Sequence, residues 1–202
     1  MQTIETATKT VIEPTIQKAF KEWTVVVDAL EKGDQILILR KGGIREGKAG
    51  FQVVAHSFWL FPTQFHQQRE AVIEVAQQRY DQIRPAELDA TAPISVQSFA
   101  QVSETRELHD WDVVSKLKGQ HIWREDVIRE RFEWGQKQAI FALVVRVFRL
   151  PEPLMVPMRP QYGGCLSWID LEPPLSTDHA TPVLDDSAFE HQLKSFHEVV
   201  KA

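Results

Sequence analysis

Hydrophobic positions recur at two spacings along the 202-residue chain, and these spacings predict helices and strands in mixed order. Steps of three and four residues predict helices, whereas β-branched or alternating runs predict strands. The predicted helices span residues 14–23, 66–83, 111–117, 122–134 and 187–200. The predicted strands span residues 24–27, 35–39, 51–54, 57–61, 94–102, 139–150 and 165–171. This order favours an α+β fold with a mixed, mainly antiparallel sheet flanked by helices.

Turn residues and composition set the expected domain organisation. Residues 1–14 are polar and are predicted to be a flexible N-terminal segment, while residues 15–202 are predicted to form a single α+β domain. Because residues 32–34 have turn chemistry, the runs 24–27 and 35–39 are expected to pair as a hairpin. Pro151 is expected to end the strand before it.

Cysteine content and apolar run length exclude several classes of protein. Cys165 is the only cysteine, so there is no intrachain disulfide and no zinc site built on two thiolates. The N-terminus lacks a signal-peptide pattern, and the longest apolar run, residues 139–145, is far shorter than the roughly 20 residues of a membrane span. The sequence therefore predicts a cytoplasmic protein with no membrane partner.

The net charge of −5 is unevenly placed along the chain. From residue 170 onward there are seven acids and two bases, which accounts for all five negative charges, and the first 169 residues are balanced. This distribution argues against nonspecific coating of nucleic acid but leaves room for a local basic patch.

The glycine-rich basic segment 40–50 is the most unusual local feature. Its four glycines allow close approach of backbone amides to a ligand, and its four bases supply charge for phosphate. The segment matches neither a P-loop nor a dinucleotide fingerprint. It is predicted to contact phosphate or nucleic acid, with a solvated hairpin loop as the alternative.

Tryptophan is abundant, with six residues, and tryptophan faces can stack on unpaired bases. Trp59 and Trp123 are candidates for such stacking, although tryptophan at these spacings also forms core. His66 is the best single candidate for a functional histidine. The predicted ligand-binding set comprises Arg40, Lys41, Arg45, Lys48, Trp59, His66, Trp123 and Arg131.

Two patterns keep a metal-dependent phosphohydrolase open as an alternative. Asp34 before Glu46 and Lys48 has the spacing of a Mg²⁺-dependent nuclease, although glycines flank the Glu-x-Lys. Glu70 and Glu74 on a helix are similar to a degenerate Nudix motif that lacks its glycine. The seven histidines form no metal signature, so the cofactor is unknown and no metal is assigned.

Several runs of residues resemble the bacterial, largely cyanobacterial family catalogued as domain of unknown function 1802, over about residues 18 to 175. These runs are residues 23–27, 37–44, 58–63 with His66 and Gln67, 123–134 and 146–151. Some family members are joined to an Mrr-type restriction-endonuclease domain, so the resemblance implies a role beside DNA restriction. We therefore expect a nucleic-acid-associated binding module linked to restriction or defence. A non-enzymatic module that binds a protein partner through the 40–50 segment and the acidic tail remains a further alternative.

Overall fold

The structure is a computed structural model that describes residues 12–41, 52–64, 68–83, 89 and 91–201. Within these residues one mixed sheet runs in the order β2-β5-β4-β3-β1-β6, and β7 pairs with β5. Only β1 and β3 pair in parallel. The strands are β1 (Thr15–Trp23), β2 (Leu37–Arg40), β3 (Ser57–Thr63), β4 (Ile94–Leu108), β5 (Ile140–Val156), β6 (Trp168–Ser176) and β7 (Thr181–Pro182).

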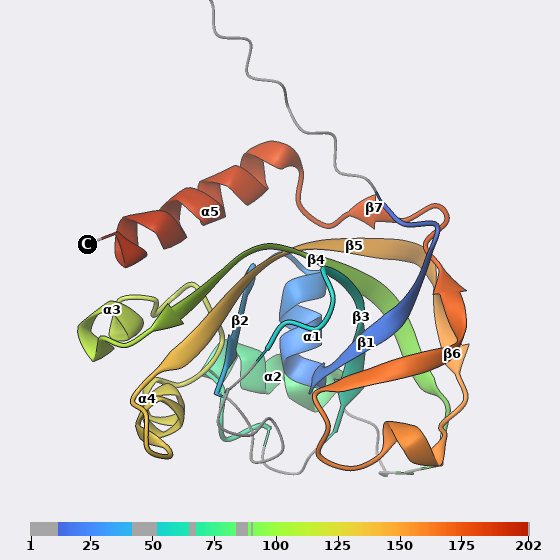
Figure 1. The fold of residues 1–202 in the computed structure, drawn as a ribbon, viewed down its shortest axis with the longest axis horizontal. Helices are drawn as coiled ribbons and strands as arrows, with labels where there is room; N and C mark the ends of the chain where they lie inside the picture. The colour runs from blue at the N-terminus through green and yellow to red at the C-terminus, as the bar shows by residue number, and fades with distance from the viewer. Residues whose placement is uncertain (1–11, 42–51, 65–67, 84–88, 90, 202) are drawn as a thin grey trace, which may run out of the picture.

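The helices confirm the predicted α+β fold with a mainly antiparallel sheet. In Figure 1, α1 lies inside the curve of the sheet, α3 and α4 lie together at one end, and α5 runs beside β4 and β5. The helices are α1 (Thr24–Glu31), α2 (Glu74–Ile83), α3 (Trp111–Ser115), α4 (Glu125–Glu133) and α5 (Asp186–Val200), with a 3₁₀ turn, η2 (Pro160–Tyr162).

The sheet curls until the ends of β1 and β2 meet, although these strands are not neighbours in the sheet. The guanidinium group of Arg40, the last residue of β2, donates a hydrogen bond to the carbonyl oxygen of Lys21 in β1. This contact brings the carboxyl ends of two distant strands to one place.

The prediction of a helix over residues 14–23 is wrong, because this segment is strand β1. Its pairing with β6 is irregular between Ile16 and Lys18. A bulge adds a residue to one strand and breaks strict alternation. Ile16 and Ala19 therefore share one face of the sheet although they are three residues apart, and Phe20 lies in the core on the other face. The bulge produced a spacing typical of a helix.

The predicted strand over residues 24–27, and the hairpin built on it, are also wrong, because α1 begins at Thr24. The helix residues Val25, Val26, Val27, Ala29 and Leu30 are all buried. A helix that is apolar on most of its circumference is stable when it is enclosed by the rest of the protein. Tertiary burial here overrides the modest strand preference of valine.

Proline positions explain two further differences. Strand β5 continues past Pro151 to Val156, because its register against β4 shifts between the pairs Ser98–Arg149 and Val96–Leu154. The prolines in this irregular stretch need not donate ladder hydrogen bonds. Residues 52–54 form no strand, and α2 begins at Glu74 rather than at residue 66. The predicted strand over residues 57–61 is confirmed within β3.

The sheet separates two apolar clusters. Along β3, Phe58 and Leu60 contribute to the cluster that contains the helices, and Trp59 and Phe61 contribute to the cluster on the opposite side. This alternation is the period of two that a strand imposes. Both faces of β3 are therefore buried.

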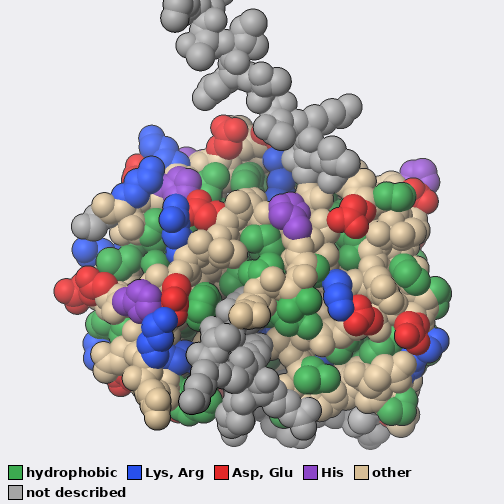
Figure 2. Space-filling model, in the orientation of Figure 1, with side chains coloured by type: hydrophobic (Ala, Val, Ile, Leu, Met, Phe, Trp, Pro, Cys, Tyr) green, Lys and Arg blue, Asp and Glu red, His purple; other side chains and the backbone are tan. Residues whose placement is uncertain are grey.

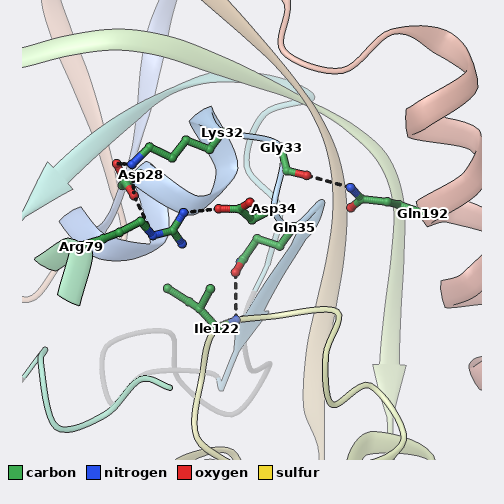
Figure 3. A network of polar contacts seen from close by, with 8 residues as sticks. All are labelled: Asp28, Lys32, Gly33, Asp34, Gln35, Arg79, Ile122 and Gln192. Carbon is green, nitrogen blue, oxygen red and sulfur yellow. Dashed lines mark hydrogen bonds and ion pairs between the residues drawn. The ribbon is translucent and has the colours of Figure 1, made fainter. Parts of the chain in front are cut away.

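The turn after α1 joins several elements through polar contacts (Figure 3). Arg79 of α2 forms an ion pair with Asp34 and lies 3.5 Å from Asp28 of α1. The side-chain oxygen of Gln35 accepts from the backbone N–H of Ile122 at 3.1 Å. The turn thus holds α1, α2 and the segment before α4 in fixed relation.

Gly33 in this turn supports a stability prediction. Its φ is +71°, its carbonyl oxygen accepts from Gln192 of α5, and an added Cβ would lie 2.5 Å from Cδ2 of Leu184. We expect Gly33→Ala to lower the free energy of unfolding by about 3 kcal/mol, through backbone strain and overpacking together. Urea unfolding measures the loss.

Gly119→Ala is the matched control, because Gly119 has φ +88° but no atom within 4 Å of an added Cβ. This variant should cost only the backbone strain, about 1 kcal/mol. Equal losses in the two variants would show that the close contact with Leu184 has no energetic weight.

Candidate functional site

The carboxyl ends of β1, β2 and β3 meet at one edge of the sheet. Because β1 and β3 are parallel, Trp23 and Thr63 are paired there, and Arg40 of β2 reaches the same edge. Charged and aromatic side chains from these ends and from α4 form what we call the arginine–tryptophan cluster. Its members are Glu22, Trp23, Arg40, Trp123 and Arg131.

Arg131 of α4 stacks on the indole rings of the cluster. Its guanidinium carbon lies 3.8 Å from the ring centroid of Trp123 and 5.5 Å from that of Trp23. The two indoles meet edge to face, with centroids 4.9 Å apart. Stacking of a guanidinium on tryptophan gains energy from the ring quadrupole, more so where water is excluded.

Glu22 supplies the negative charge of the cluster. Its side chain is 2% exposed, and Oε2 lies 3.5 Å from Nε of Arg40 while Oε1 accepts from the backbone N–H of Trp23. Arg40 also stands over the ring of Phe20. The cluster therefore contains two guanidinium groups and one carboxylate, which leaves it with net positive charge.

Arg131 is the cation of this cluster that makes no ion pair with a described residue. Burial lowers the pKa of Arg131 to about 10, with the like charge of Arg40 acting in the same direction and Glu22 in the opposite one. The group is still charged at neutral pH. Among the described residues no carboxylate or carbonyl lies within ion-pair or hydrogen-bond distance of its guanidinium group. Its N–H donors therefore have no acceptor on the part of the chain that the structure describes.

Three predicted site residues, Arg40, Trp123 and Arg131, are thus brought together. Trp123 is only 3% exposed and also belongs to the hydrophobic core, which is the alternative that the sequence left open for it. Lys41 is placed differently, since its ammonium donates to the carbonyl oxygens of Phe132, Lys137 and Ala139. Burial lowers the pKa of Lys41. This lysine joins the end of β2 to the connection between α4 and β5, so its donors are already used.

Trp59 is a core residue, which is the alternative that the sequence left open. It is fully buried, packs against Phe99, and donates from Nε1 to the carbonyl oxygen of Ile16 at 3.1 Å. A ligand base cannot reach it. Arg45, Lys48 and His66 lie outside the described residues, and their predicted roles stay predictions.

The described acidic residues of the phosphohydrolase alternative do not form a metal site. Asp34 is paired with Arg79, and Glu70 and Glu74 are exposed. Glu46 lies outside the described residues. Among the residues that the structure does describe, no group of three or more histidine, cysteine or acidic side chains is arranged to hold a metal ion.

Sequence reasoning missed Glu22 and Trp23. The available signal was an acid inside the apolar run from Ala19 to Val27, but the helical assignment of this segment gave the acid no defined neighbour. Only the strand, and its meeting with β2, places Glu22 against Arg40.

His121, which neighbours the cluster, is 7% exposed. Its Nδ1 accepts from the backbone N–H of Trp123 at 3.2 Å, so the ring proton lies on Nε2. Burial lowers the pKa of His121 to about 4, and the positive charge of Arg131 acts in the same direction. The imidazole is therefore neutral at physiological pH.

Charge on the visible face of the molecule is mixed. Figure 2 shows acidic and basic side chains interspersed, with no large area of one sign.

The chain belongs to a family described as a domain of unknown function, DUF1802, which it matches over residues 19–195. No curated protein is significantly similar to it in sequence. No helix among the described residues has the length and apolar content needed to span a membrane.

Weak structural likeness links the chain to crystal structures of ASCH from Zymomonas mobilis. A serine-to-alanine variant of that protein is 14% identical, with a TM-score of 0.43 over 91% of this chain and 98% of the other. A second ASCH structure is 14% identical, with a TM-score of 0.40 over 88% and 93%. Likenesses with TM-scores below 0.5 do not establish the function of this chain.

Glu22→Gln tests the electrostatic balance of the cluster. Loss of the carboxylate removes the counter-charge of Arg40 and one of the two that act on Arg131, so we expect the free energy of unfolding to fall by about 3 kcal/mol. The double variant with Arg131→Met should lose about 1 kcal/mol less than the sum of the two single variants, because one of the opposed cations is gone. Urea unfolding of all four proteins measures the coupling, and strict additivity would contradict it.

The lowered pKa of His121 predicts a pH dependence of stability. The unfolded chain takes up this proton near pH 6.5 and the folded protein only near pH 4, so the unfolded state binds more protons between these values. The free energy of unfolding should therefore fall as pH decreases through this window, by about 3 kcal/mol from this group.

His121→Asn provides the comparison, because the Asn amide oxygen can accept the same backbone hydrogen bond but does not titrate. Chemical unfolding at several pH values should show a shallower loss in this variant than in the wild type. Parallel curves for the two proteins would contradict the assignment to His121.

Proposed function

We propose that this chain is a cytoplasmic nucleic-acid-binding module that holds a single-stranded segment of RNA or DNA at the arginine–tryptophan cluster. One observation carries the proposal: the guanidinium group of Arg131 is stacked on Trp123 and has no acceptor among the described residues. A guanidinium group directs its N–H donors along its own plane. This geometry suits bidentate binding of a phosphate or of a base edge.

Preorganisation supports the same proposal. Stacking on two indoles fixes the guanidinium before a ligand arrives, so less side-chain entropy is lost on binding. Partial burial strengthens its interaction with an anion, because the local dielectric is lower than that of water. Glu22 lies within ion-pair distance of Arg40, and Arg131 is the second cation of the cluster, whose charge a ligand would neutralise.

The chain connectivity adds predicted contacts. Arg45 and Lys48 follow shortly after Arg40, and His66 follows Thr63, so the sequence supplies further polar side chains close to two of the strand ends that form the site. We also propose that the module acts beside DNA restriction or defence, which is the setting that the family resemblance implies. No observation on the described residues favours the phosphohydrolase or the protein-partner alternative.

Arg131→Gln tests the proposal. Fluorescence anisotropy with labelled single-stranded DNA and RNA at low salt, where the electrostatic contribution is largest, should show binding by the wild type. We expect the variant to bind at least about tenfold more weakly and with a shallower salt dependence. Undetectable binding by the wild type to both nucleic acids would overturn the proposal.

Arg129→Gln is the matched control. Arg129 lies on the same helix and also stacks on a tryptophan, Trp111 at 4.4 Å, but it is paired with Glu133. Its loss should leave nucleic-acid affinity nearly unchanged. Equal weakening by the two variants would mean that α4 contributes only general positive charge.

A further inference from the structure

An open pocket of about 370 Å³ lies between α3, α4 and the segment that joins them. This volume is at the small end of the range for ligand sites, which suits a small flat group rather than a folded partner. Its interior is mainly apolar and aromatic. The walls are formed by Ile73, Trp111, Val114, His121, Trp123 and Ile128.

Charged residues at the pocket are already paired with one another. Lys118 lies 3.5 Å from Glu125, and Arg124 makes a two-point contact with Asp126. The cations are therefore neutralised, and a charged ligand gains little inside the pocket. An uncharged group that carries a hydrogen-bond acceptor fits this environment better.

His121 supplies the specific polar group of the pocket. Because Nδ1 accepts from the backbone of Trp123, Nε2 is a donor, and no acceptor for it is found among the described residues. The imidazole lines the pocket although only 7% of the residue is exposed. A buried donor of this kind is best satisfied by a neutral acceptor such as a carbonyl oxygen or a ring nitrogen.

We propose that this pocket accepts an unpaired nucleobase whose acceptor atom binds Nε2–H of His121. The inference deepens the proposed function and rests on it. Trp123 belongs to both sites, since Arg131 stacks on its ring and the same indole lines the pocket. A base in the pocket and its phosphate at Arg131 would thus both lie next to Trp123. All four bases carry an acceptor edge, so His121 selects for a base rather than for one particular base.

Uncharged nucleosides test the pocket without the phosphate contribution. Titration of adenosine, guanosine, cytidine and uridine into the full chain, followed by tryptophan fluorescence, should give saturable quenching with at least one of them. His121→Asn keeps the acceptor for the Trp123 backbone but has no donor at the position of Nε2, because its side chain is shorter, and should weaken binding by about fivefold. Ser115→Trp should obstruct the pocket and abolish binding.

His191→Asn, on the exposed side of α5, is the matched control and should leave the affinity unchanged. Thermal unfolding and circular dichroism establish that each variant is folded, and Ser115→Trp provides the test if His121→Asn is not. Absence of nucleoside binding, or binding that neither pocket variant weakens, would overturn the inference.

Oligonucleotide binding separates this inference from the proposed function. Oligonucleotide affinity that depends on Arg131 but not on His121 or Ser115 would leave the proposed function standing and remove the pocket. Nucleoside binding that depends on the pocket, without any oligonucleotide binding, would overturn the proposed function and limit the pocket to free nucleosides.

Discussion

The structure depends on how charge is buried at the carboxyl ends of β1 and β2. A carboxylate that is removed from water needs a counter-charge, and Glu22 has one in Arg40, which also holds the backbone of Lys21. These contacts join two strands that are not neighbours in the sheet and so close its curl around α1. The same region then accommodates a second guanidinium, Arg131, on an aromatic support. Fold closure and the candidate site therefore share one set of residues.

The sequence pattern predicted most helices and strands, but it assigned a helix to one strand and a strand to one helix beside the site. Residues 14–23 and 24–27 were assigned the wrong type, because a bulge gave β1 a helical spacing and burial allowed valines into α1. Both effects arise from contacts distant in sequence, with β6 in one case and with the enclosing core in the other. Arg40, Trp123 and Arg131 were predicted from residue type alone, whereas Glu22 required the correct strand.

Arg40, Lys41 and Arg131 are all cationic, but the structure gives them different partners. Arg40 donates to a backbone carbonyl and lies 3.5 Å from a carboxylate, and Lys41 donates to backbone carbonyls. Arg131 stacks on indole rings, and the described residues offer its guanidinium group no hydrogen-bond acceptor. A linear sequence shows which side chains are cationic but not which of them the fold has already neutralised. Of these three described cations, the one without an acceptor among the described residues lies on α4, far along the chain from residues 40–50.

The three carbonyl oxygens around Lys41 have a consequence for comparing relatives. An ammonium group can direct its three protons at three converging oxygens, whereas the planar fork of arginine cannot. Selection on folding alone would then retain a basic dipeptide at positions 40 and 41, even in a relative that binds no anion. Invariance of that dipeptide across a family would therefore report architecture rather than anion binding.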